Sequence, residues 1–208
     1  MSKRHRSLLA LLSLFGLLAP AAAALADDCF GFSDILPPDA IVHGYSLKDA
    51  AEATANYNLS QGTTPLDVPF QFVPLEGTTT VTEGTFLYLP IFFSDNSPPI
   101  LGNFPNDVQN QFADAVYFFD PADGIGLEEV DVTVDNERTV SLGPEYVVGF
   151  NTRPLLDGAT KDVQLATFLA PLSKGTHTIA VHVELDGAAA LAAGIPPVFD
   201  TTATLIVK

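Results

Sequence analysis

Residues 128–134 have the sequence Glu-Glu-Val-Asp-Val-Thr-Val, in which every second side chain from position 130 onward is valine. Successive side chains of a β-strand point to opposite faces, so the three valines would share one face, and Glu129 and Asp131 would share the other. Such strict alternation is typical of a strand with one face buried and the other face exposed to solvent. The segment therefore predicts a strand in a sheet with one solvated face.

Short apolar or alternating segments of the same kind occur before and after residues 128–134. Asp135-Asn136 is a dipeptide typical of a tight hairpin turn, and it leads into another short run. The predicted strands are residues 68–73, 78–81, 86–93, 128–134, 137–142, 145–150, 163–169, 176–185 and 198–207. Pro- and Gly-containing turns separate them, and the helical crossovers of a doubly wound α/β fold are missing. We therefore expect a mainly β fold, an antiparallel β-sandwich of immunoglobulin-like or jelly-roll type.

Residues 86–93, Phe-Leu-Tyr-Leu-Pro-Ile-Phe-Phe, are apolar at every position. A run of this length without polar alternation predicts a strand covered on both faces. Pro90 has no backbone N–H to donate to a neighbouring strand, so we expect a bulge or a change of partner there.

One or two short helices are expected in addition. Ser46 and Asp49 have the spacing of a capping box, and good helix formers follow, which predicts a helix over residues 47–58. A second short helix is predicted over residues 106–113, where Val108 and Phe112 lie four positions apart.

The first 26 residues have the layout of a secretory signal peptide. A basic start is followed by the apolar run 8–18 and by small residues up to Ala26. The apolar run is shorter than the roughly 20 residues that cross a bilayer. We therefore expect cleavage, a single domain over residues 27–208, and a secreted or periplasmic location without a membrane contact. Cys29 has no second cysteine in the chain, so it is expected to be free or paired with another molecule.

The charge of the chain restricts its partners. The formal net charge is −16, and the predicted mature part holds all 25 acidic residues but only six of the nine basic ones. A strongly negative surface repels phosphate backbones and anionic lipid surfaces, which excludes nucleic acid as an expected partner. An extracellular protein or a glycan is the class of partner that stays open.

Patterns of catalytic or metal-binding residues are scarce. The sequence contains no H-E-x-x-H or C-x-x-C motif and no G-x-S-x-G elbow. His177 and His182 are five residues apart on one predicted strand, which places His177 on the core side and His182 on the wet side. They are therefore not expected to share a metal ion.

The loop that begins at Asp120 offers one possible cation site. Asp120, Asp123 and Glu128 could hold Ca²⁺ loosely, although the spacing does not fit an EF-hand. No other cofactor is indicated. Glu129 and Asp131 are interpreted as solubilising surface acids.

Three functions stay open from the sequence. The first is an exported non-catalytic module for interaction or structure. The second is an extracellular hydrolase or lyase that acts on polymers through loop acids such as Asp120, Asp123 or Asp157. The third is a module for Ca²⁺-dependent adhesion.

Two segments resemble motifs of an uncharacterised family of secreted bacterial β-sandwich proteins. These are residues 81–91, Val-Thr-Glu-Gly-Thr-Phe-Leu-Tyr-Leu-Pro-Ile, and residues 171–179, Pro-Leu-Ser-Lys-Gly-Thr-His-Thr-Ile. The resemblance extends thinly over residues 45–208. The chain departs from it at residues 70–72, where such proteins tend to have Trp, and it lacks their loop cysteines. The resemblance implies an exported β domain and no particular activity.

Overall fold

The computed structural model describes residues 34–59, 66–122, 124–154 and 158–208, all within the unit Phe32–Lys208. The predicted signal peptide over residues 1–26 and Cys29 lie outside the described residues. Among the helices described, none has both the length and the apolar character needed to cross a membrane.

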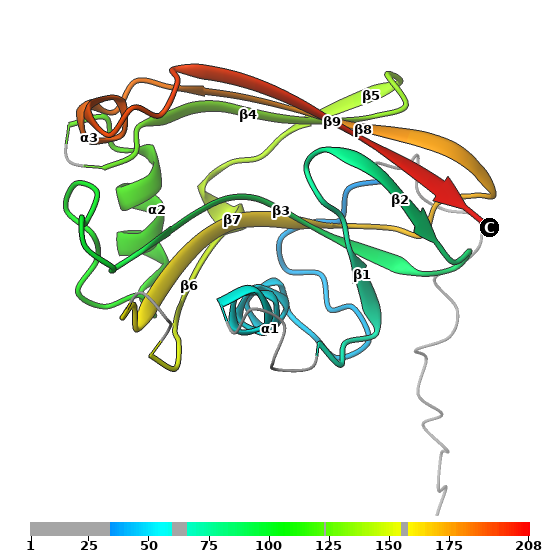
Figure 1. The fold of residues 1–208 in the computed structure, drawn as a ribbon, viewed down its shortest axis with the longest axis horizontal. Coiled ribbons are helices and arrows are strands. Elements are labelled where there is room, and N and C mark those ends of the chain that lie inside the picture. The colour runs from blue at the N-terminus through cyan, green and yellow to red at the C-terminus, as the bar shows by residue number, and fades with distance from the viewer. Residues whose placement is uncertain (1–33, 60–65, 123, 155–157) are drawn as a thin grey trace, which may run out of the picture. The chain divides into compact units, whose positions relative to one another are not determined.

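The fold of the described residues is mainly β (Figure 1). In chain order the elements are α1 (Leu47–Leu59), β1 (Phe70–Phe72), β2 (Gly77–Val81), β3 (Phe86–Asp95), α2 (Gln111–Phe119), β4 (Leu127–Val134), β5 (Arg138–Ser141), the 3₁₀ turn η1 (Pro144–Tyr146), β6 (Val147–Asn151), β7 (Lys161–Leu169), β8 (Gly175–Leu185), α3 (Ala188–Ala192) and β9 (Val198–Val207). Each of the strands predicted from the sequence has a counterpart among them.

The strands form two sheets. One sheet has the order β1-β3-β7-β6, and the other has the order β2-β9-β8-β4-β5. Figure 1 shows them as two layers, with α1 on the outer side of the four-stranded sheet. Buried side chains of both sheets belong to one hydrophobic cluster.

The prediction of purely antiparallel sheets was wrong, because each sheet contains one parallel pair. β1 runs parallel to β3, and β2 runs parallel to β9. The chain leaves the first sheet after β1, forms β2 in the other sheet, and returns to form β3. The chain reverses its direction at each of these two passages between the sheets. As a result, β1 and β3 run in the same direction. Alternation within a strand shows which face is buried but not the direction of its neighbour, so the sequence pattern could not reveal this.

The hairpin predicted at Asp135-Asn136 is confirmed. Both residues have positive φ, 53° and 57°, which is the backbone of a type I′ turn and suits Asp and Asn better than most residues. The turn joins β4 to β5, and the register places Val134 opposite Arg138.

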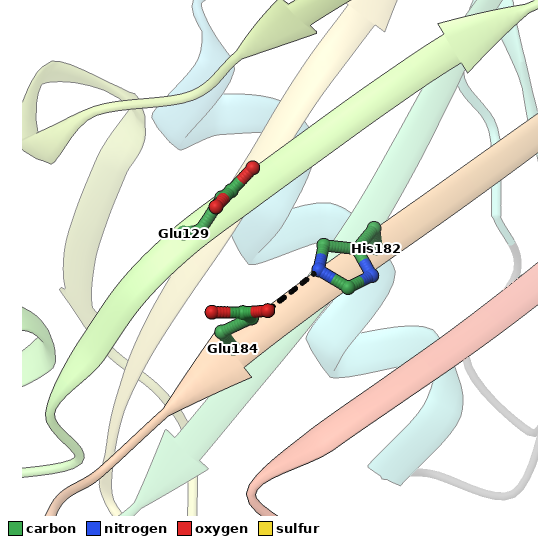
Figure 2. Close-up of side chains that lie close together, drawn as sticks. All are labelled: Glu129, His182 and Glu184. Atoms are coloured by element: carbon green, nitrogen blue, oxygen red, sulfur yellow. Dashed lines mark hydrogen bonds and ion pairs between the residues drawn. The ribbon is translucent and has the colours of Figure 1, made fainter.

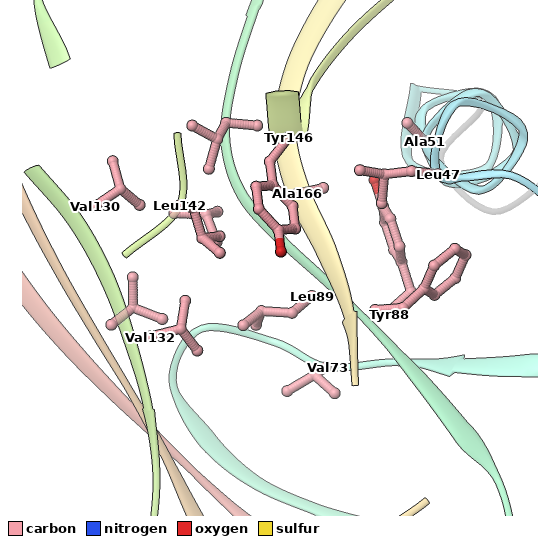
Figure 3. Packing of buried hydrophobic residues seen from close by; sticks show 14 of the residues in the cluster. Leu47, Ala51, Val73, Tyr88, Leu89, Val130, Val132, Leu142, Tyr146 and Ala166 are labelled. Carbon is pink, nitrogen blue, oxygen red and sulfur yellow. The ribbon is translucent and has the colours of Figure 1, made fainter. Parts of the chain in front are cut away.

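The apolar strand β3 is buried on both faces, because α1 lies on one side of it and the five-stranded sheet on the other. Leu87, Tyr88 and Leu89 are all inaccessible to solvent. In Figure 3, Tyr88 lies on the side of α1, beside Leu47, whereas Leu89 lies on the opposite side, toward β4. The predicted irregularity at Pro90 is confirmed as well, because the pairing with β7 shifts register between Pro90 and Phe92.

The helix predicted over residues 47–58 is confirmed as α1. Its capping box is present: the Ser46 backbone N–H donates to Asp49 Oδ2 at 2.9 Å, and the Asp49 N–H donates to Ser46 Oγ at 3.2 Å. The Ser46 hydroxyl also donates to Asp49 Oδ2 at 2.6 Å, and this hydrogen bond, together with the one from the Ser46 backbone N–H, lowers the pKa of Asp49.

The helix predicted over residues 106–113 was placed too early, since α2 spans Gln111–Phe119. Asp107 caps a separate turn by accepting from the Gln109 N–H. Asn110 is the true N-cap, and its side chain accepts from the N–H groups of Phe112 and Ala113. Two Asx residues three positions apart offered equivalent starting points, and tertiary packing selected the later one.

Candidate functional site

A row of polar side chains crosses the five-stranded sheet on the face opposite the valines. In the register of this sheet, Ser141 of β5 lies opposite Asp131 of β4. Asp131 in turn lies opposite His182 of β8, and His182 lies opposite Asp200 of β9. Hydrogen bonds join Ser141 to Asp131 and His182 to Asp200. Four adjacent strands thus contribute polar side chains to one line.

A β-bulge brings a further pair of carboxylates beside this row. Leu127 pairs with Leu185 and Glu129 pairs with Glu184, so Glu128 is the extra residue between them. The bulge lets both Leu127 and Val130 stay buried while Glu129 faces outward. Glu129 consequently lies across from Glu184, next to His182 (Figure 2).

We call Glu129, Asp131, His182, Glu184 and Asp200 the carboxylate–histidine cluster. Within it, one ligand atom each from Glu129, His182 and Glu184 lie within 4.8 Å of one another. Glu129 is exposed, whereas His182 and Glu184 are half-buried. Three side chains of this kind, from two paired strands, could coordinate one metal ion.

The two ring nitrogens of His182 have different partners. Nδ1 lies 2.7 Å from Asp200 Oδ1, and Nε2 lies 3.3 Å from Glu184 Oε1. A carboxylate that accepts from Nδ1–H holds the ring in one orientation and leaves Nε2 as the ligand atom, as is usual around histidine ligands of metals. Asp200 therefore positions His182, and Nε2 faces the two glutamates.

The pKa values of two members of the cluster are raised. A hydrogen bond and charge repulsion from Asp131 raise the pKa of Glu129, with a further contribution from Glu184. The hydrogen bond that His182 donates to Asp200 raises the pKa of His182, and Glu184 adds to the effect. Both shifts follow from the crowding of negative charge on one exposed strand face. A cation that binds there relieves the same repulsion.

The cation site predicted from the sequence is only partly within the described residues. Asp120 caps the C-terminal end of α2, and its Oδ1 accepts from the Ala122 N–H at 2.9 Å. Glu128 is the exposed bulge residue of β4. Asp123 lies outside the described residues, as does Asp157 of the proposed hydrolase set. The Ca²⁺ site and the loop-acid hydrolase both stay predictions.

Sequence reasoning placed three members of the cluster on the correct face but did not bring them together. Glu129, Asp131 and His182 were each expected on a wet face, and this is confirmed by their burial. The missing information was that β4 and β8 are neighbours with Asp131 opposite His182. The His-x-Glu spacing of His182 and Glu184 was the available signal, since residues two apart on a strand share a face.

Two cavities are separate from the cluster. One of about 840 Å³ lies between α1 and β1, and its described lining includes Thr54, Tyr57 and Phe72. The other, of about 500 Å³, is lined by residues that include Glu52 and Arg153. The described lining of neither cavity contains a member of the cluster, which lies on an open sheet face.

His177 has a structural environment, as the alternation predicted. Its ring is largely buried, and Nδ1 lies 2.6 Å from Asp135 Oδ2 while Nε2 lies 2.8 Å from the Ser173 carbonyl oxygen. Desolvation opposes charge on the ring, but the hydrogen bond to Asp135 and the one to Ser173 outweigh it and raise the pKa of His177. Desolvation likewise opposes charge on Asp135, yet the hydrogen bonds from His177 and Thr178 lower the pKa of Asp135.

This pair gives a pH-dependent prediction for Asp135→Asn. Asparagine keeps the turn and loses the negative charge, so we expect a loss of about 1–2 kcal/mol of unfolding free energy near pH 5.5. The contribution of His177 is complete below its unfolded pKa of about 6.5 and is lost as the pH rises through its raised folded pKa. The contribution of Asp135 is present above about pH 4 and is lost as the pH falls through its lowered folded pKa. Urea denaturation from pH 3 to 9 measures this difference, and a difference that does not vary with pH would contradict it.

Comparisons with known proteins give no family. No family model matches the chain, and no curated protein matches it either. Among solved structures, the chain is similar to the solution structure of amebosin, with 10% sequence identity and a TM-score of 0.29 over 68% of this chain and 100% of that chain. The resemblance to a secreted bacterial family stays a prediction.

Proposed function

We propose that this chain is an exported, non-catalytic β-sandwich module that binds a divalent transition-metal ion on its outer sheet face. The observation that carries the proposal is the convergence of Glu129, His182 and Glu184, whose ligand atoms lie within 4.8 Å of one another. The Nδ1–Asp200 hydrogen bond supports it independently, because it directs Nε2 toward the two glutamates. For the sandwich itself we keep the immunoglobulin-like or jelly-roll type, supported by two sheets that share one core.

The mixed donor set indicates the class of metal. One imidazole nitrogen and two carboxylates suit Zn²⁺ and its neighbours in the first transition row, whereas Ca²⁺ prefers oxygen ligands alone. Three protein ligands on an open face leave a coordination position for a group of another molecule. An extracellular protein or a glycan that supplies such a group is the partner class we propose.

Metal binding competes with protons at this site. His182 must be without its Nε2 proton, and Glu129, whose pKa Asp131 raises, must be ionised. Because both pKa values are raised, affinity for the metal should increase as the pH rises toward and through neutrality. Below that range the protonated cluster should bind the metal weakly.

The test is isothermal titration calorimetry of the full chain with zinc chloride at pH 5.5 and 7.5. We expect His182→Ala to weaken zinc binding at pH 7.5 by at least about tenfold, and Asp200→Asn to weaken it by about tenfold through loss of ring positioning. Glu137→Gln is the matched control, since it removes an exposed carboxylate of the neighbouring hairpin outside the cluster. Equal affinities for zinc in His182→Ala and Glu137→Gln would overturn the proposal.

A calcium titration separates this proposal from the alternative site. Calcium binding that survives His182→Ala and is lost in Asp120→Asn would favour the loop that begins at Asp120. Turnover of a polysaccharide or peptide substrate that disappears in Asp120→Asn would favour the hydrolase hypothesis instead and would contradict a non-catalytic role.

A further inference from the structure

The helix α2 has a charged residue where a core residue is expected. Asp114, in its first turn, is only 1% exposed, whereas Phe112 of the same helix is 78% exposed. Asp114 Oδ1 has no hydrogen-bond partner. A buried carboxylate without a partner strongly disfavours its ionised form. The position of Asp114 therefore has an energetic cost that a structural role alone does not explain.

Gly149 of β6 provides the space for this carboxyl group. A Cβ atom at position 149 would lie 2.3 Å from Asp114 Oδ2 and 2.4 Å from the carbonyl oxygen of Val108. Any other residue at 149 would occupy the volume that the carboxyl group and this carbonyl now fill. Asp114 thus lies directly in the contact between α2 and β6.

Two charged groups of the described residues act on the ionisation of Asp114. Asp107, in the loop before α2, disfavours its ionisation, and Lys48 of α1 favours it more weakly. The turn η1, which contacts α2, contributes Glu145 and Tyr146, and the strand β6 contains no titratable residue.

Two more groups belong to neighbouring segments. Lys161 donates through Nζ to the Asn106 carbonyl oxygen, and Asp162 of β7 pairs with Phe150 beside Gly149. Glu128 belongs to β4, which also contacts α2. Desolvation, followed by repulsion from Asp107, raises the pKa of Asp114 to about 7.

We propose that Asp114 is a pH-sensitive latch between α2 and β6. In its neutral form the carboxyl group fits the space above Gly149, and α2 packs against the sheet. Ionisation leaves a negative charge between α2 and β6 without a partner for Oδ1. The helix then separates from β6 so that water can reach the carboxylate.

The direction of the pH effect follows from the raised pKa. In the unfolded chain Asp114 loses its proton near pH 4, whereas in the folded chain it keeps the proton to about pH 7. The stabilisation that the neutral Asp114 carboxyl group provides is complete below about pH 4, and it is lost as the pH rises through the folded pKa of Asp114. The contact between α2 and β6 should therefore be tight in mildly acidic solution and loosened above neutrality.

Hydrogen exchange of the full chain at pH 5.5 and 8, corrected for the intrinsic rate, tests this latch. We expect the amides of α2 and β6 to lose about tenfold in protection at pH 8. In Asp114→Asn the side chain cannot ionise, so protection should be the same at both pH values. Asp39→Asn, an exposed acid outside this contact, is the matched control and should behave like the wild type.

A direct titration keeps the test decisive if Asp114→Asn does not fold. The side-chain carboxyl ¹³C shift of Asp114 in the wild type should titrate near pH 7, and Asp107→Asn should move the midpoint to lower pH. A midpoint below pH 5 would overturn the proposal. So would a midpoint near pH 7 without any change in the protection of α2, because the carboxyl group would then titrate without opening the contact.

Discussion

The substitution Gly187→Ala is expected to lower the free energy of unfolding by about 3 kcal/mol or more. Gly187 precedes α3 and lies against the segment that leads into β4. A Cβ atom there would be 2.1 Å from the carbonyl oxygen of Ile125 and 2.4 Å from its carbonyl carbon. Both are backbone atoms, so no side-chain rotation can remove the clash. The hydrogen bond from the Asp186 N–H to the Gly126 carbonyl oxygen, 2.9 Å long, holds the two segments at this distance.

Urea denaturation of Gly187→Ala measures the effect, with Gly194→Ala as the control. Gly194 has φ of 84°, but a Cβ there would meet nothing within 4 Å. Its replacement should therefore cost only about 1 kcal/mol, from backbone strain. If the two variants unfold at the same urea concentration, the close approach at Gly187 does not constrain the fold as we argue.

The second large effect is expected for Phe168→Ala, with a loss of about 3–5 kcal/mol. Phe168 of β7 is 2% exposed and packs edge-on against Phe70 and Tyr88, at ring-centroid distances of 5.5 and 5.7 Å. These rings join β1, β3 and β7, so the truncation leaves a cavity that three strands border. The backbone of these strands is tied by sheet hydrogen bonds and cannot close the space.

Phe112→Ala is the matched control for this prediction. It removes the same side chain from a position that is 78% exposed, and we expect a change within about 0.5 kcal/mol. The two variants can be compared by thermal or urea unfolding under one condition. A loss below about 1.5 kcal/mol for Phe168→Ala would show that the aromatic cluster contributes less than its burial indicates.

Local patterns were sufficient for the strands and for α1, whereas α3 (Ala188–Ala192) is a third helix where the sequence predicted one or two. The valines of β4 are buried, and the Ser46–Asp49 cap begins α1 as expected. In each case the information lies within a few residues of the element. The start of α2 was also misplaced, because Asp107 and Asn110 are both good caps, and it is Asn110 that begins the helix in which Tyr117 and Phe118 are buried.

Long-range pairing was the part that the sequence did not reveal. No local feature of β2 indicates that its partner is β9, or that the two are parallel. The metal site depends on the same kind of information. Glu129 and Glu184 come together through the β4–β8 register and the bulge at Glu128, and the alternation within a strand shows neither which strand is its neighbour nor in which register the two pair.

The place of β9 in its sheet has a consequence for biosynthesis. This strand lies between β2 and β8, with β2 completed more than a hundred residues earlier in the chain. Until residues 198–207 have been made, β8 has an unpaired edge, and β2 has no partner in this sheet. The five-stranded sheet therefore cannot be completed before residues 198–207 are made, and a chain that stalls before that point would expose unpaired strand edges to its neighbours.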